Sequence, residues 1–204
     1  MLDEIICGDC LEVMPTIPDN SINLIITDPP YGINKGKIDG DESLQIWVNS
    51  LYDCSRVLKP DSFYCTFASI AKLNVVLMLA SAFFSYRWTT LLYINNGMVR
   101  GSVGFSAYVP CVVFMNGNAK IKKQIRDVRE VSAKKPQHHP YEKNIRFMTD
   151  LVEAFSHPED TVLDPFSGSG TTAVAAKATG RHYICIEKEP EYCAIAEKRI
   201  AEML

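Results

Sequence analysis

The fold class is decided by the stretch Thr161-Val162-Leu163-Asp164-Pro165-Phe166-Ser167-Gly168-Ser169-Gly170-Thr171-Thr172. In it a short apolar run ends in an acid, a glycine-rich turn follows, and a segment with helical periodicity begins at Thr171. Glycines let backbone N–H groups come close to a ligand, and the N-terminus of a helix favours negative charge there. This strand–turn–helix order predicts an α/β protein that binds a ligand at the carboxyl ends of its strands.

Outward from this stretch, short apolar and β-branched runs alternate with segments of helical periodicity. The alternation predicts one α/β domain with a mixed, mostly parallel sheet of seven strands and helices on both faces. The predicted strands are Glu4–Cys7, Ile22–Thr27, Ser62–Phe67, Trp88–Ile94, Val109–Met115, Thr161–Leu163 and His182–Ile186. The predicted helices are Ser43–Leu58, Ile70–Phe84, Lys143–Phe155, Thr171–Thr179 and Pro190–Met203. No helical segment separates Trp88–Ile94 from Val109–Met115, so these two should form an antiparallel pair at one edge.

Composition limits the classes of protein that this chain can belong to. It has 204 residues, 47% of them hydrophobic and 22% charged, which fits a single globular domain spanning residues 1–204. No apolar run approaches the roughly 18 residues that cross a bilayer. Seven cysteines, an odd number, and the lack of a secretory leader favour a reducing cytoplasm.

The glycine turn alone fits two kinds of cofactor. The pattern Gly168-x-Gly170-x-x-Ala173 also matches a dinucleotide fingerprint, and Glu187, 17 residues past Gly170, could hold ribose hydroxyls. Two features argue against a dinucleotide: little chain follows to build a second nucleotide-binding half, and Asp164 would repel a pyrophosphate. That acid suits a cationic ligand such as S-adenosylmethionine, which carries a sulfonium and an ammonium group.

A second cluster follows another apolar run, where Leu24–Thr27 leads into Asp28-Pro29-Pro30-Tyr31. Neither proline has an N–H, and both stiffen the backbone, so a carboxylate and a fixed carbonyl acceptor stand beside an aromatic ring. Two acceptors suit the two N–H groups of a planar amine, and Tyr31 could stack on its ring. The alternative is a rigid corner between a strand and a loop.

The two clusters together resemble the amino-methylating DNA methyltransferases. The order, Asp28–Tyr31 before Asp164–Gly170, is similar to the circularly permuted β group of that family. Gly8-Asp9-Cys10, Leu58–Phe63 and His139-Pro140-Tyr141-Glu142-Lys143 resemble further segments of it. One departure is Asn144, where the family carries a proline. The resemblance implies a Rossmann-like methyltransferase domain, with a catalytic half at 1–116 and a cofactor-binding half at 139–204. It also implies a prokaryotic or phage-encoded protein in the cytoplasm.

The resemblance also implies roles for individual residues. Asp28, Pro29, Pro30 and Tyr31 would be catalytic, with no covalent adduct to the base and so no cysteine nucleophile. The implied S-adenosylmethionine site consists of Asp9, Cys10, Asp28, Lys143, Asn144, Asp164, Pro165, Phe166, Ser167, Gly168, Ser169, Gly170, Thr171, Thr172, Glu187 and Lys188. The resemblance also implies an order of strands in the sheet: Glu4–Cys7, His182–Ile186, the strand ending at Asp164, Ile22–Thr27, Ser62–Phe67 and then the antiparallel edge pair. This order puts Asp28 and Asp164 at neighbouring strand ends. The aspartate that opens the tetrapeptide resembles the adenine-N6 members more than the cytosine-N4 members.

Residues 117–138 stand where site-specific members carry a recognition insert, and this connector is too short for a separate module. The connector belongs to a basic stretch, because Gly117–Arg146 holds nine Lys/Arg and three Asp/Glu in a chain of net charge −3. We expect contact with DNA phosphates, a solvated charged loop being the alternative. The residues concerned are Lys120, Lys122, Lys123, Arg126, Arg129, Lys134 and Lys135.

Several alternatives stay open from the sequence alone. The short connector predicts short or relaxed site recognition. It leaves two alternative functions open, an RNA base methyltransferase and a partner-dependent methyltransferase subunit. The chain could act as a monomer or a homodimer. Cys7 and Cys10 have the spacing of half a zinc site, but no second close pair follows, so we expect no metal.

Overall fold

The computed structural model describes residues 2–30, 44–95, 99–100, 105–132 and 143–203. One sheet of eight strands dominates it, in the order β1-β10-β9-β2-β3-β7-β4-β8. Its strands are β1 (Glu4–Cys7), β2 (Ile22–Thr27), β3 (Leu58–Phe67), β4 (Ser85–Ile94), β7 (Tyr108–Asn116), β8 (Val128–Val131), β9 (Thr161–Asp164) and β10 (His182–Glu187). A separate two-stranded ribbon consists of β5 (Val99–Arg100) and β6 (Phe105–Ser106).

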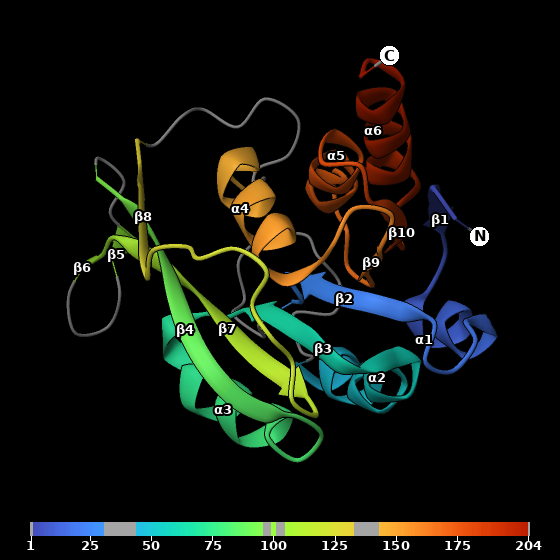
Figure 1. Cartoon of the computed structure of the whole chain (residues 1–204). Coiled ribbons are helices and arrows are strands. Elements are labelled where there is room, and N and C mark those ends of the chain that lie inside the picture. The colour runs from blue at the N-terminus through green and yellow to red at the C-terminus, as the bar shows by residue number, and fades with distance from the viewer. Residues whose placement is uncertain (1, 31–43, 96–98, 101–104, 133–142, 204) are drawn as a thin grey trace.

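Helices cover both faces of the sheet, as the alternating pattern predicts (Figure 1). The helices are α1 (Cys10–Val13), α2 (Leu44–Val57), α3 (Leu73–Ala80), α4 (Ile145–Phe155), α5 (Thr171–Ala178) and α6 (Pro190–Ala201), with 3₁₀ turns at Met14–Thr16 and Ile70–Lys72. The core on one face joins side chains of the sheet to those of α4 and α5, including Phe147 and Leu151. The core on the other face joins the sheet to α1, α2 and α3, and Trp47 is fully buried there. No helix in the described part of the chain is long and apolar enough to cross a membrane.

The pairing of the strands confirms the mixed, mostly parallel sheet. β1, β10, β9, β2 and β3 are parallel to one another. β7 is antiparallel to both β3 and β4. The predicted order of the seven strands is therefore confirmed, including the antiparallel pair β4–β7. Since β7 runs against its neighbours, it ends at the edge of the sheet opposite the carboxyl ends of β2, β9 and β10.

The prediction of seven strands is wrong by one. The connector 117–138 contains β8, which pairs in parallel with β4 at the outer edge of the sheet. Backbone bonds from Leu91 N to Asp127 O (2.7 Å) and from Asn95 N to Val131 O (3.0 Å) hold it there. β8 has only four residues, two of them charged, so its sequence lacks an apolar run that would distinguish a strand from a loop.

The predicted helix Ile70–Phe84 is also longer than the one observed. Its first turn is 3₁₀ and α3 ends at Ala80, where the N–H groups of Ser81 and Phe84 close the helix onto Leu77 and Ala80. The other predicted helices and strands agree with the structure to within a few residues at their ends.

Candidate active site

The two acidic strand ends lie next to each other. β2 and β9 are paired in parallel, with Leu24 opposite Val162 and Ile25 opposite Leu163, so both strands leave the sheet at the same edge. Asp28 follows the last residue of β2, and Asp164 is the last residue of β9. The negative charge of Asp28 is one of the influences that raise the pKa of Asp164. The predicted juxtaposition of Asp28 and Asp164 is thus confirmed.

Asp164 is a buried carboxylate. Its Oδ2 accepts a hydrogen bond from the Thr172 hydroxyl (2.5 Å) and its Oδ1 accepts one from Phe166 N (3.1 Å). Loss of solvation raises the pKa of Asp164 to about 7, and Asp28 adds to the rise, while the hydrogen bonds oppose it. A carboxyl group poised near neutrality at a strand end is typical of a functional site.

The glycine turn between β9 and α5 has a fixed shape. Gly170 has φ +77°, and a Cβ at that position would lie 2.7 Å from the Cβ of Ala196 on α6. Arg199 of α6 braces the turn by donating from Nη1 to Ser169 O (2.6 Å) and Thr171 Oγ1 (3.2 Å). Only glycine fits at position 170, because both the dihedral angle and the close approach of α6 exclude a side chain.

One buried hydroxyl in this turn has no hydrogen-bond partner within the described structure. Ser167 Oγ is shielded from solvent and yet unbonded. Because a buried polar group without a partner costs about 1–3 kcal/mol, such a group in a ligand-binding turn points to a ligand that satisfies it. Ser167 therefore supports the prediction that this turn contacts a bound molecule.

The neighbouring strand ends bring the other predicted cofactor residues together. β1 and β10 pair so that Cys7 lies opposite Glu187. The Glu187 carboxylate accepts from Gly168 N (2.8 Å), which links it directly to the glycine turn. Asp9 caps α1 by accepting from Leu11 N (2.9 Å), and Lys188 Nζ lies 3.4 Å from Asp9 Oδ2. The predicted site residues on β1, β10, β9 and β2 thus share one edge of the sheet.

Around the catalytic motif, Pro29 is buried and Pro30 half-buried, and Tyr31 lies outside the described residues. Lys143, predicted as a cofactor contact, donates from Nζ to Asp28 Oδ2. Its Nζ also lies 5.1 Å from the centroid of the Phe67 ring, at the end of β3. The Asn144 side chain caps α4 by accepting from Phe147 N (3.1 Å).

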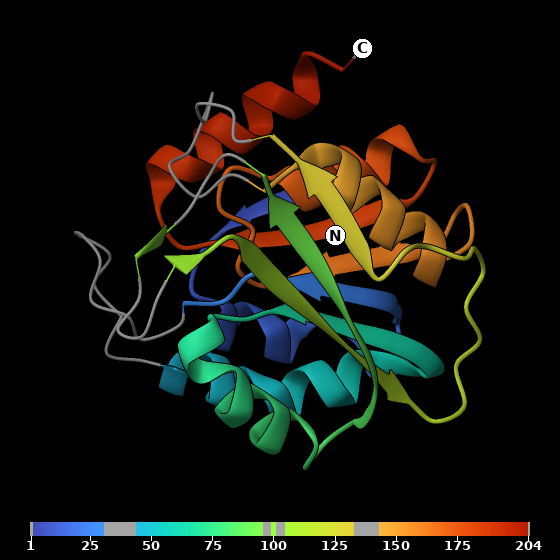
Figure 2. The same ribbon diagram turned by 90° about the vertical axis from the view of Figure 1, so that its left-hand side faces the viewer.

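The structure places three lysines of the basic connector, Lys120, Lys122 and Lys123, away from this edge. They follow β7, which ends at the opposite edge, and Figure 2 shows the yellow segment after β7 on the right while the arrowheads of β2 and β3 point left. Lys122 N bonds Ala154 O at the end of α4 (2.8 Å), and Lys123 Nζ pairs with Glu153 (2.5 Å). Arg129 of β8 pairs with Asp150 of α4. Lys134 and Lys135 lie outside the described residues.

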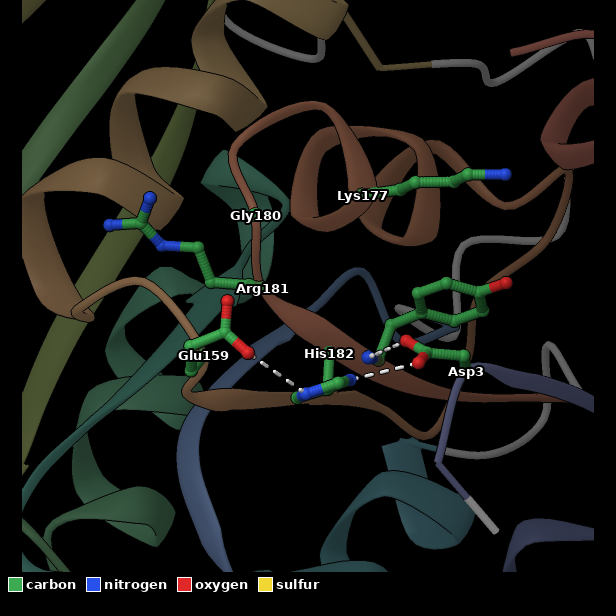
Figure 3. A pocket seen from close by; sticks show the side chains of 7 residues that line it. Asp3, Glu159, Lys177, Gly180, Arg181 and His182 are labelled. Atoms are coloured by element: carbon green, nitrogen blue, oxygen red, sulfur yellow. Dashed lines mark hydrogen bonds and ion pairs between the residues drawn. The ribbon is translucent and has the colours of Figure 1, made fainter. Parts of the chain in front are cut away.

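A pocket of about 310 Å³ also lies at the opposite edge, at the start of β10 (Figure 3). Its side chains already satisfy one another, since His182 Nδ1 lies 2.8 Å from Asp3 Oδ2 and its Nε2 lies 3.5 Å from Glu159 Oε2. The hydrogen bond and charge of Asp3 raise the pKa of His182. Among the described residues no group of three or more His, Cys, Asp and Glu could hold a metal ion. We therefore place the candidate active site at the edge that carries Asp28 and Asp164.

Sequence reasoning missed two residues of this site, Phe67 and Arg199. Phe67 ends β3 beside β2 and so could have been included as a third strand end at the same edge. Arg199 gives no such signal, because its contact with Ser169 depends on how α6 packs against the turn.

Comparison with known proteins agrees with this geometry. Residues 112–198 match the family described as "DNA methylase". The Escherichia coli (strain K12) protein named "Putative methylase YubD" is 32% identical over 209 residues, covering 98% of this chain and 91% of that protein. Among solved structures, the PvuII DNA methyltransferase (cytosine-N4-specific) has a TM-score of 0.82 at 18% identity, over 96% of this chain and 85% of that one. The M1.HpyAVI–SAM complex has a TM-score of 0.79 at 23% identity, over 97% of this chain and 98% of that one.

The two solved structures show that the fold is shared, and the first relative shows the family. The chain belongs to the DNA methylases, the DNA amino-methyltransferases of the adenine-N6 or cytosine-N4 type.

Proposed function

We propose that this chain uses S-adenosylmethionine to methylate the N6 amino group of adenine in DNA, with short or relaxed sequence recognition. The observation that carries the proposal is the pair of carboxylates at neighbouring strand ends. Asp164 lies beside a glycine turn and Asp28 beside the Pro29 carbonyl. In our proposal Asp164 serves the methyl donor and Asp28 serves the acceptor.

The residues at the edge fit S-adenosylmethionine by their chemistry. Asp164 is bonded to a hydroxyl and a backbone N–H, which leaves its negative charge to be balanced by a cationic ligand. Ser167 Oγ needs a partner. Asp9 and Glu187, on the next two strands, suit the adenine amino group and the ribose hydroxyls. When bound, the cofactor supplies a methyl group on a positively charged sulfur.

The acceptor side of the site must make an amino nitrogen nucleophilic. The lone pair of such a nitrogen is delocalised into the base, so the free amine is a poor nucleophile. In our proposal the Asp28 carboxylate and the Pro29 carbonyl accept its two N–H bonds and draw the nitrogen towards a tetrahedral shape. The lone pair would then point at the methyl group, whose bond to sulfur would break as the N–C bond forms, and the proton that the nitrogen loses would pass along its hydrogen bond to the Asp28 carboxylate. Positioning supplies most of the rate. In a duplex the base must first swing out of the stack.

Four buried cysteines of this chain agree with a mechanism that forms no covalent adduct to the base. Burial raises the pKa of the Cys10 thiol to about 12, and it raises the pKa of Cys54, Cys65 and Cys185 as well. Thiols of this kind carry almost no thiolate at neutral pH and are poor nucleophiles.

Cytosine N4 is the second candidate acceptor. Its amino group presents the same two N–H donors to Asp28 and Pro29, and a cytosine-N4-specific enzyme has the fold of this chain at a TM-score of 0.82. We favour adenine because an aspartate opens the tetrapeptide Asp28–Tyr31, as in the adenine-N6 members that the motif resembles.

A transfer assay with labelled S-adenosylmethionine on unmethylated DNA and on RNA tests the proposal, with product nucleosides identified by mass spectrometry. We expect N6-methyladenine in DNA from the wild type and almost none from Asp28→Asn. N4-methylcytosine would overturn the base assignment, and label in RNA alone would overturn the substrate. Cofactor binding without any transfer would favour a partner-dependent subunit.

A further inference from the structure

The contact between Lys143 and Asp28 joins two distant parts of the chain at the centre of the candidate site. Lys143 precedes α4, and its Nζ donates to Oδ2 of the carboxylate that follows β2. Both side chains are largely shielded, with 15% of the Lys143 side chain and 23% of the Asp28 side chain exposed. A charge-assisted hydrogen bond at such a position is stronger than a surface ion pair, because solvent screens it less.

The ammonium group is held from a second direction by an aromatic ring. Its Nζ lies 5.1 Å from the centroid of Phe67, within the range of a cation–π contact. The Phe67 ring is itself packed edge-on against Phe147 of α4, with 5.9 Å between ring centroids. The next residue, Asn144, caps α4 and so fixes the backbone beside the lysine. Lys143 is thus a rigidly placed cation rather than a flexible surface lysine.

A carboxylate has two oxygens that together offer about four acceptor positions. An ammonium fixed on Oδ2 therefore sets the orientation of the Asp28 carboxylate and leaves it the capacity to accept from an amine. It also places a positive charge beside Asp28, which neighbours the buried carboxylate of Asp164. Without this cation two negative groups would face each other at the strand ends.

We propose that Lys143 is a positioning residue that holds the Asp28 carboxylate in the orientation that receives the target amine, and that it contributes little to cofactor affinity. The inference rests on the proposed function, because it assumes that Asp28 accepts the amine. It differs from the expectation that Lys143 belongs to the cofactor site, since the lysine contacts Asp28 and Phe67. If Lys143 is a positioning residue, removing its ammonium should lower turnover and leave cofactor affinity unchanged. If it is a cofactor ligand, the same change should lower cofactor affinity and leave turnover at saturating cofactor unchanged.

The test measures turnover and cofactor affinity separately in Lys143→Met, which keeps the length of the side chain and removes its charge. We expect kcat on unmethylated DNA to fall about 10- to 100-fold, as for the loss of alignment in an active site. The dissociation constant of S-adenosylhomocysteine, measured by calorimetry, should change less than about twofold. Lys143→Arg should restore most of kcat. Lys198→Met, at an exposed site on α6, is the matched control and should match the wild type.

A rise of tenfold or more in the dissociation constant with unchanged kcat at saturating cofactor would show that Lys143 is a cofactor ligand and would overturn the proposal. An Arg variant as inactive as the Met variant would also overturn it. A wild type that transfers no methyl group would refute the proposed function, and the positioning role with it.

A double-mutant cycle with Asp28→Asn tests the route by which Lys143 acts. If it acts through Asp28, Lys143→Met should cause little further loss in the Asp28→Asn background. Losses that multiply would contradict the proposal. Lys143→Gln replaces the Met variant in both experiments if thermal melting shows that Lys143→Met does not fold.

Discussion

Replacing Asp164 by asparagine should make the stability of this protein less dependent on pH. Burial raises the pKa of Asp164 from 3.8 to about 7 in the folded chain, whereas in the unfolded chain the group returns to its ordinary value. The folded state therefore binds more protons than the unfolded state between about pH 4 and 7, and the free energy of unfolding falls as pH rises through that window. Asp164→Asn keeps the shape of the side chain and removes the titration.

The magnitude follows from the shift. The pKa of Asp164 rises by about three, and each step of one corresponds to about 1.4 kcal/mol. The ionised carboxylate therefore lowers the unfolding free energy by about 4 kcal/mol at pH 8. Asparagine also weakens the hydrogen bonds from Thr172 and Phe166, at a cost of about 1–3 kcal/mol that hardly depends on pH. We therefore expect the difference in unfolding free energy, variant minus wild type, to increase by about 4 kcal/mol between pH 4 and pH 8.

Urea unfolding of the cofactor-free protein at several pH values between 4 and 8 measures this difference. Asp127→Asn, at an exposed position before β8, is the matched control. Parallel pH profiles for wild type and Asp164→Asn would refute the reasoning, because they would show that Asp164 does not change protonation on unfolding in this range. If Asp164→Asn gains stability relative to the wild type as pH rises and also no longer binds S-adenosylmethionine, then the carboxylate that lowers stability is the one that the cofactor requires.

Three further predictions concern the cofactor site and the basic connector. The affinity for S-adenosylmethionine, measured by calorimetry, should rise between pH 6 and 8 as Asp164 loses its proton, and it should rise less for S-adenosylhomocysteine, which lacks the sulfonium charge. Gly170→Ala should lower the unfolding free energy by about 1–3 kcal/mol more than Gly180→Ala, because both glycines have positive φ but only Gly170 faces Ala196. Equal losses would mean that the close approach of α6 is unimportant. Joint replacement of Lys122 and Lys123 by alanine should leave the salt dependence of DNA binding unchanged, because both follow β7 at the opposite edge; a flatter slope would show that DNA reaches them.

The positions of the strands along the chain and of the acids at their ends could be predicted because both depend on local patterns. Apolar runs such as Ile22–Thr27 identify the strands, and parallel strands end at the same edge of a sheet. Once β2 and β9 are neighbours, Asp28 and Asp164 must lie close together. Only the resemblance to a family, however, gave the order of the strands in the sheet.

The contacts made by long side chains could not be predicted in this way. Lys143 and Asp28 are 115 residues apart in the sequence, and no local pattern indicates that they meet. The path of the connector could not be predicted for another reason, because β8 is short and carries two charged residues. Its charges suggest DNA, but the antiparallel β7 brings Lys122 and Lys123 to the opposite edge, and Lys123 and Arg129 pair with Glu153 and Asp150 of α4.

The two carboxylates at the strand ends differ in what balances their charge, and this difference assigns their roles. Asp28 is paired with the Lys143 ammonium, so its surroundings are close to neutral and suit an uncharged amine. Asp164 is bonded to the Thr172 hydroxyl and the Phe166 N–H, and it is buried at a cost that a cation would offset. A positively charged methyl donor is therefore favoured beside Asp164 and a neutral acceptor beside Asp28. The reverse arrangement would place two cations together at Asp28 and leave Asp164 without compensation.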